Sequence, residues 1–154
     1  MTLYYLDSSA LAKPYLAERG SAWVSELVST QNVAISMLSF AEVASALGRR
    51  SREGGVSAAQ RVEEYQTFIR NALWWSVIPV DQVILEAASQ ILLEGLAVPM
   101  LRTLDAIHLA TAQQSFMLAR QSGENGAVVV TSDRRMIDVA LAASLVVDNP
   151  EEHE

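Results

Sequence analysis

The sequence predicts an α/β fold in which a short central parallel sheet of about five strands is flanked by helices on both faces. Two observations lead to this expectation. Short apolar runs of strand length alternate with longer segments of helical periodicity, and ordinary turn signals separate them. A chain of 154 residues, with 51% hydrophobic and 19% charged side chains, also fits one soluble globular domain.

Apolar runs of strand length occur five times along the chain. The first ends in Asp-Ser-Ser, which predicts a buried strand followed by a loop or the start of a helix. Runs rich in β-branched residues form most of the others and favour strands for the same reason. The expected strands are Leu3–Leu6, Val33–Ser36, Val77–Val80, Ala127–Val130 and Leu145–Val147.

Longer segments between these runs place apolar residues at helical spacing. The expected helices are Ser21–Ser29, Phe40–Arg52, Ala58–Trp75, Gln82–Glu94, Leu104–Arg120 and Arg135–Ala143. The breaks at Glu53–Gly55, Gly95–Pro99 and Gly123–Gly126 are the size of loops rather than of linkers. We therefore expect one domain over residues 1–148, followed by a frayed acidic tail over residues 149–154.

The composition excludes several kinds of site. With no cysteine and only two histidines, the chain has neither disulfides nor a Cys/His zinc site. Any metal ion must be held mainly by oxygen, which leaves magnesium, manganese or calcium. A net charge of -7 argues against bulk attraction to nucleic acid, although it does not exclude a local basic rim. The arginines that could form such a rim and guide a phosphate, or simply keep helix ends solvated, are Arg49, Arg50, Arg52, Arg134 and Arg135.

The beginning of the sequence lacks the basic stretch and apolar segment that are typical of a signal peptide. No apolar run approaches the roughly 20 residues that are needed to cross a bilayer. We therefore expect a cytoplasmic protein that makes no membrane contact.

Four acidic residues have apolar neighbours that are expected to be buried. Asp7 follows the first predicted strand, and Asp133 lies just past the fourth. Glu42 and Asp105 lie near the starts of two mainly apolar helices. Because ligands of open parallel sheets bind outside the carboxyl ends of the strands, all four acids can reach one site at that edge.

Each acid also has a purely structural interpretation. Ser39 and Glu42 form the Ser-x-x-Glu pattern of a capping box. Asp7 could form an Asx turn, and Asp133 could cap the helix that follows it. The helix macrodipole favours Asp105 at its place near the start of a helix. Capping and metal binding are compatible, because a carboxylate has two oxygens.

The joint arrangement favours a metal site. Two carboxylates about 4 Å apart repel by roughly 4 kcal/mol at an effective dielectric constant near 20, so a cluster of four needs a cation. Magnesium prefers oxygen ligands and commonly combines carboxylates with substrate phosphate. Such a site indicates phosphodiester chemistry, in which metal ions orient a water and stabilise the departing oxygen.

These residues occur in segments that resemble the PIN-domain family, and most closely its VapC-like toxin ribonucleases. The segments that carry the resemblance are Tyr5–Lys13, Ser39–Val43, Leu104–Ala110 and Val130–Asp133. Any one of them is weak evidence, but their order and spacing cover nearly the whole chain. The resemblance implies a small PIN-like domain whose acids gather at the strand ends and bind Mg²⁺ or Mn²⁺ for RNA cleavage.

Position by position, the resemblance implies a catalytic, metal-binding quartet of Asp7, Glu42, Asp105 and Asp133. Two further polar side chains, Ser9 and Thr131, match positions that support the quartet. The sequence departs from the family at Ser8, where threonine is frequent, and at Met136, where many relatives have a further acid. The second departure argues against a complete second metal site.

Resemblance to toxins also implies partners: an RNA substrate, a cognate antitoxin that covers the acidic cleft, and a second copy of the chain in a homodimer. Two alternatives stay open. The chain could be a PIN-type RNA-processing nuclease outside any toxin pair, or a catalytically silent interaction domain with the same fold.

For three aromatic residues, a packing role is favoured over a functional one. His108 lies one helical turn after Asp105, but a histidine packed between helix and sheet is favoured over a general base, because a metal-activated water needs no protein base. Trp74 and Trp75 are expected to fill a core or a partner surface rather than to stack on bases.

Overall fold

The computed structural model describes residues 1–95 and 101–153. Within these residues, five parallel strands form one sheet in the order β3-β2-β1-β4-β5. Their bounds are β1 (Thr2–Leu6), β2 (Asn32–Ser36), β3 (Ser76–Ile78), β4 (Gly126–Val130) and β5 (Val146–Asp148). The predicted α/β class and the five predicted strands are confirmed, with shifts of one or two residues at most strand ends.

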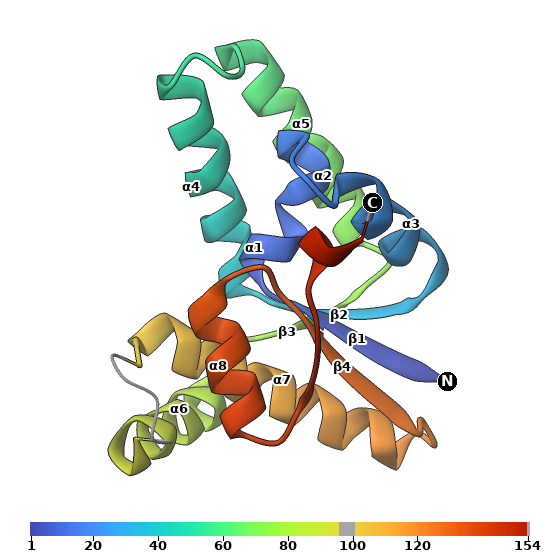
Figure 1. Ribbon diagram of the computed structural model, residues 1–154, viewed down its shortest axis with the longest axis vertical. Coiled ribbons are helices and arrows are strands. Elements are labelled where there is room, and N and C mark those ends of the chain that lie inside the picture. Colours follow the sequence, from blue (N-terminus) through green and yellow to red (C-terminus); the bar gives the residue numbers. More distant parts are fainter. Residues whose placement is uncertain (96–100, 154) are drawn as a thin grey trace.

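Helices from the C-terminal half of the chain cover one face of the sheet (Figure 1). They are α6 (Gln82–Glu94), α7 (Thr103–Gln121) and α8 (Arg134–Ala142). Because side chains alternate along a strand, Leu3 and Tyr5 of β1 point to this face and join its core. The longest of the three, α7, supplies much of that core, including Leu109 and Phe116.

The opposite face is covered by the N-terminal half (Figure 1). The helices here are α1 (Ser8–Leu11), α2 (Lys13–Leu16), α3 (Ser21–Thr30), α4 (Leu38–Arg52) and α5 (Ala58–Ala72). Leu6 of β1 points to this second core, whose centre is the fully buried Phe68. Aromatic rings surround Phe68 in edge or tilted contacts and belong to Tyr15, Phe40, Tyr65 and Trp75.

The predicted helices are confirmed, although some of their ends differ. The helix expected over Ala58–Trp75 ends at Ala72, because three further residues are needed to enter β3 at Ser76. The short α1 and α2 were expected only as a loop or helix start. The predicted break at Gly95–Pro99 lies largely outside the described residues, and Gly95 itself ends α6 at φ 76°.

The expectation of a frayed C-terminal tail is wrong for residues 149–153. Pro150–Glu152 form a 3₁₀ turn that packs against α3 (Figure 1). The side chain of Asn149 caps this turn, and Pro150 is buried. The acidic composition of the tail favoured fraying, but the tail makes a well-defined contact with the rest of the domain.

The strand order brings distant segments together at one edge. The chain leaves β1 toward β2 on one side of it, and β4 is paired on the other side. This reversal is a topological switch point, where ligands of open α/β sheets bind. Among the described residues, none of the helices has the length and hydropathy that a membrane span requires.

Candidate active site

Asp7 lies directly after β1 at the switch point and is buried, with 4% of its surface exposed. Its Oδ1 accepts hydrogen bonds from the N–H of Ala10 (3.1 Å) and the hydroxyl of Ser9 (2.7 Å), so it caps α1. Its Oδ2 accepts a hydrogen bond from the hydroxyl of Thr131 (2.7 Å), which follows β4. The carboxylate therefore joins the ends of the neighbouring strands β1 and β4.

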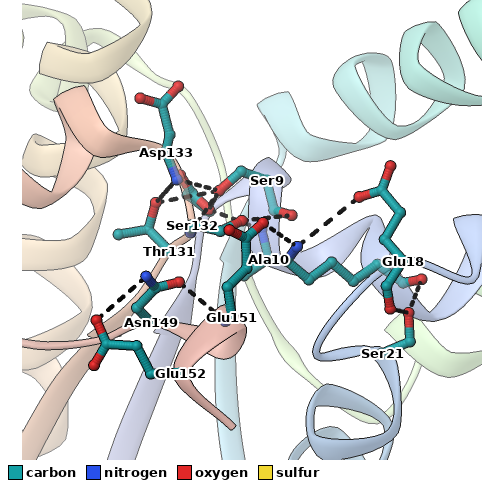
Figure 2. Close-up of polar contacts among 12 residues, drawn as sticks. Ser9, Ala10, Glu18, Ser21, Thr131, Ser132, Asp133, Asn149, Glu151 and Glu152 are labelled. Carbon is teal, nitrogen blue, oxygen red and sulfur yellow. Dashed lines mark hydrogen bonds and ion pairs between the residues drawn. The ribbon is translucent and has the colours of Figure 1, made fainter. Parts of the chain in front are cut away.

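Ser9 connects Asp7 to the loop after β4. Its hydroxyl oxygen accepts hydrogen bonds from the N–H groups of Ser132 (3.0 Å) and Asp133 (3.1 Å), as Figure 2 shows. Thr131 also accepts from the N–H of Asp133 at 3.1 Å. Ser9 and Thr131 thus hold the backbone that presents Asp133.

Glu42 projects from α4 and is held by two neighbouring side chains. The Nε2–H of His108 on α7 donates a hydrogen bond to Glu42 Oε2 at 2.7 Å, and the hydroxyl of Ser8 donates to the same oxygen. On the far side of the ring, His108 Nδ1 and the hydroxyl of Tyr5 are 2.7 Å apart. A chain of contacts therefore runs from the buried β1 strand to the Glu42 carboxylate.

The capping-box interpretation of Glu42 is wrong. The helix begins at Leu38, so Ser39 lies inside α4 rather than at its cap. Ser36 performs the local function instead, since its hydroxyl oxygen accepts from the N–H of Leu38 at 3.2 Å. Glu42 is consequently free of a structural task at the helix start and bonds to His108.

The other two acids lie at helix starts, as predicted. Asp133 caps α8 and accepts hydrogen bonds from the N–H groups of Arg135 (2.8 Å) and Met136 (3.4 Å). Asp105, in the first turn of α7, accepts from the N–H of Arg102 at 3.3 Å. The guanidinium of Arg135 lies 4.0 Å from the Asp105 carboxylate. Each of these two acids has one oxygen to which no partner in the described residues is assigned.

One open cavity of about 480 Å³ brings the four acids together. Their segments are far apart in the sequence, and only the fold makes them neighbours. The cavity is lined by Asp7, Ser8, Ser9, Ala12, Lys13, Leu16, Glu18, Glu42, Ser45, Ala46, Arg49, Arg102, Leu104, Asp105, His108, Ser132, Asp133 and Glu151. The four acids therefore line one cavity at the carboxyl ends of the strands.

Burial and neighbouring charges shift the pKa of three of the four acids. Burial raises the pKa of Asp7 above its ordinary value. Burial also raises the pKa of Asp105, and the negative charge of Asp133 adds to that effect. Burial acts to raise the pKa of Glu42, but the hydrogen bond and charge of His108 outweigh it and lower the pKa overall. Asp7 and Asp105 are therefore carboxylates for which a nearby cation would relieve an unfavourable charge.

The donor chemistry suits a divalent cation that prefers oxygen ligands, because four carboxylates line one cavity and the charge of Asp133 acts to raise the pKa of Asp105. In the side-chain positions that the structure gives, no group of three or more His, Asp or Glu residues in the described parts of the chain could hold a metal ion. Binding would therefore require Asp105, which is half-buried, and Asp133, which is exposed, to turn toward Asp7 and Glu42.

The predicted arginines divide between the cavity and the surface. Arg49 lines the cavity, and Arg135 contacts Asp105, whereas Arg50, Arg52 and Arg134 are not among the lining residues. Arg102 and Lys13 also line the cavity, and neither was predicted from the sequence as a functional residue. A signal for Arg102 exists, since it precedes Asp105 by three residues.

The aromatic residues are placed largely as expected. His108 is buried between α7 and the sheet, at 5% exposure. Its bond to Glu42 was missed, although its position one helical turn after Asp105 pointed to the same edge. Trp75 packs on the Phe68 core and donates its indole N–H to the carbonyl of Val28. Trp74 is 89% exposed, so it does not fill a core.

Comparison with known families matches residues 4–141 to the PIN domain. The chain belongs to the PIN domain family. The matched range contains all four acids and the supporting residues Ser9 and Thr131. The structure is accordingly a single PIN domain, with a parallel sheet between two helical layers.

Individual relatives resemble this PIN domain over almost its entire length. Ribonuclease VapC46 of Mycobacterium tuberculosis is 32% identical over 154 residues, which cover 97% of this chain and 99% of the relative. Among solved structures, FitAcB from Neisseria gonorrhoeae has a TM-score of 0.66 at 18% identity and covers 98% of this chain and 99% of its own. Mycobacterium tuberculosis VapC20, described as a sarcin-ricin loop cleaving toxin, has a TM-score of 0.63 at 19% identity, with 93% and 96% covered.

Proposed function

We propose that this PIN domain is a divalent-metal-dependent endoribonuclease that hydrolyses RNA phosphodiester bonds and acts as the toxin of a toxin–antitoxin pair. The observation that carries the proposal is the meeting of Asp7, Glu42, Asp105 and Asp133 in one cavity. Relationship to a protein named as a ribonuclease, at 32% identity over nearly the full length, supports the same activity.

The four acids differ in what they contribute. Asp7 is rigid, because both of its oxygens are held by groups from α1 and the β4 end. Glu42 is aimed by His108, while Asp105 and Asp133 approach from two helix starts. Together they would hold Mg²⁺ or Mn²⁺, because carboxylate oxygens are suitable ligands for both ions. A bound divalent ion supplies charge neutralisation at the phosphate and lowers the pKa of a water.

RNA is the substrate class that this cavity fits, provided that the metal binds first. The acids repel a phosphate backbone, and the net charge of -7 offers no general attraction. Arg49 and Arg102 line the cavity and would contact phosphates on either side of the scissile bond. We therefore expect metal-loaded protein to bind RNA more tightly than metal-free protein, and equal affinities would contradict this order.

Removal of the metal is expected to abolish RNA cleavage. The test is digestion of an end-labelled structured RNA by purified protein with manganese, with magnesium or with a chelator. Products that depend on either metal and disappear with chelator support the proposal, because the carboxylates alone cannot stabilise the departing oxygen. Identical products with chelator would contradict it.

As the pH is lowered, metal binding is expected to weaken at a higher pH than it would if the aspartate ligands had ordinary pKa values. Metal ligands must be ionised, and the raised pKa values of Asp7 and Asp105 mean that these groups take up protons above the ordinary value of about 3.9. Calorimetric titration with manganese, at steps from about pH 7 to about pH 4, measures the effect. An affinity that stayed constant over that range would contradict the assignment of these two ligands.

We also propose a cytoplasmic antitoxin partner and a homodimer. Solved structures with this fold include a toxin–antitoxin complex from Klebsiella pneumoniae, at a TM-score of 0.61 and 19% identity. Exposed apolar side chains on α6 and α7 provide a surface for such contacts. They are Val83, Leu85, Leu93, Met117 and Leu118.

Expression of the chain without a partner distinguishes the toxin from an RNA-processing nuclease. Arrest of growth that a neighbouring gene product relieves supports the toxin, and normal growth with preserved RNA cleavage supports a processing enzyme. A silent interaction domain would show neither arrest nor cleavage, and RNA binding would survive loss of Asp105.

A further inference from the structure

Lys13 on α2 is the only lysine of the chain, and it is buried. Its Nζ lies 2.9 Å from the Glu151 carboxylate of the C-terminal turn and 3.9 Å from that of Glu18. Figure 2 shows both carboxylates. A buried ammonium is costly unless it is paired, so this contact decides the position of the Lys13 side chain.

The C-terminal turn that carries Glu151 is held in place by contacts other than the ion pair. Gly20, at φ +83°, packs so closely on Pro150 that a Cβ at position 20 would clash with the Pro150 carbonyl. The ring of His153 stacks on Trp23 with centroids 4.0 Å apart and an interplanar angle of 2°. These contacts keep the turn beside α3, so Glu151 can leave Lys13 without the turn detaching.

The ion pair belongs to the wall of the proposed active site. Lys13, Glu18 and Glu151 line the same cavity of about 480 Å³ as the four acids. Lys13 is therefore a cation of the cavity whose charge is neutralised by a carboxylate from the end of the chain. The proposed cleavage of RNA uses none of these three residues.

We propose that Lys13 binds a phosphate of the RNA substrate and that Glu151 is an internal competitor for the Lys13 ammonium. The inference rests on the proposed endoribonuclease activity. Carboxylate and phosphate oxygens are both anionic acceptors for an ammonium, so the Glu151 carboxylate occupies a position that a phosphate can take. The Glu151 side chain is 48% exposed, which allows it to turn into solvent when RNA arrives. The long, flexible lysine side chain can follow the phosphate.

Glu151→Gln is the central test, and Glu152→Gln is its matched control. Both substitutions remove one negative charge from the same turn, but Glu152 contacts Asn149 rather than Lys13. RNA affinity is measured by fluorescence anisotropy with manganese and a labelled single-stranded RNA analogue that cannot be hydrolysed, with the Asp105 carboxylate intact, because loss of Asp105 would itself weaken metal and RNA binding. Glu151→Gln is expected to tighten binding by about two- to fivefold, the worth of a partly exposed ion pair, and Glu152→Gln much less.

The salt dependence gives a second readout that a structural role would not change. When RNA displaces Glu151 from Lys13, one ion pair replaces another. Once Glu151→Gln has removed the competing carboxylate, Lys13 has no ion pair with residue 151 to lose. The release of counterions by the phosphate contact then appears in full. The slope of log affinity against log salt is therefore expected to steepen by about 0.7 for single-stranded RNA.

Lys13→Met completes a double-mutant cycle. It should weaken RNA binding, and Glu151→Gln should have no further effect in the Lys13→Met protein. Thermal unfolding of each variant verifies the fold. Equal affinities for Glu151→Gln and Glu152→Gln, or weaker binding by Glu151→Gln, would overturn the inference while leaving the proposed function intact. Absence of RNA binding by every variant and by the unsubstituted protein would overturn both.

Discussion

Replacing Asp105 with asparagine is expected to reduce RNA cleavage by about three orders of magnitude, because several kcal/mol of charge stabilisation depend on a complete ligand set. The substitution preserves the size of the side chain and removes one negative charge. It also leaves an oxygen that can accept from the Arg102 N–H, so the start of α7 should be undisturbed. The loss should therefore appear in activity and metal affinity, with little change in stability.

Asp138→Asn is the matched control for this experiment. Asp138 is an exposed acid on α8, and it does not line the cavity that the described residues form. Both proteins are purified identically and assayed with manganese, which also controls for contaminating nuclease. Activity that survives Asp105→Asn at the level of Asp138→Asn would contradict the assigned role of Asp105. Calorimetry with manganese then tests whether the metal still binds.

Replacing His108 with asparagine is expected to lower the rate of cleavage by about 10- to 100-fold, which is typical when a partner that orients a metal ligand is lost. The histidine does not need to act as a base, because its Nε2–H points to the Glu42 carboxylate. Without that bond, Glu42 loses the contact that aims it into the cavity. Ser8 alone then remains to hold the carboxylate.

The measurement that separates this positioning role from general damage is the manganese dependence of the rate. His108→Asn should raise the manganese concentration required for half-maximal activity and weaken manganese binding in calorimetry. Ser115→Ala is the control, since Ser115 is buried on the same helix but bonds only to the Ala112 carbonyl. Unchanged manganese dependence in the His108 variant would show that Glu42 is positioned by other groups.

Local patterns were sufficient for most of the fold. A short apolar run followed by Asp-Ser-Ser predicts β1 and the start of the next helix, since both depend on neighbours in sequence. The same holds for Asp133, whose cap on α8 follows from the residues beside it. Local pattern failed at Ser39, because Ser-x-x-Glu also occurs in a helix that begins two residues before the predicted start at Phe40, namely at Leu38.

The candidate site was predictable only as a set of acids with a common edge. The spacing and apolar flanks of Asp7, Glu42, Asp105 and Asp133 were visible in the sequence, and a parallel sheet implies that strand ends meet. Their hydrogen-bond partners were not visible. Which residue holds Glu42 depends on how α4 and α7 pack across the end of the sheet, and no local spacing encodes that contact.

The sequence by itself determined the α/β class and the parallel strands, and it singled out four acids as candidate oxygen ligands, because these follow from periodicity, composition and residue type. Only the tertiary structure decided that His108 bonds to Glu42 and that Glu151 reaches Lys13, which are separated by 66 and 138 positions in the chain. Such contacts arise from the packing of whole helices and from the burial of charge. Local propensity cannot express either of these effects, since both depend on residues that become neighbours only after folding.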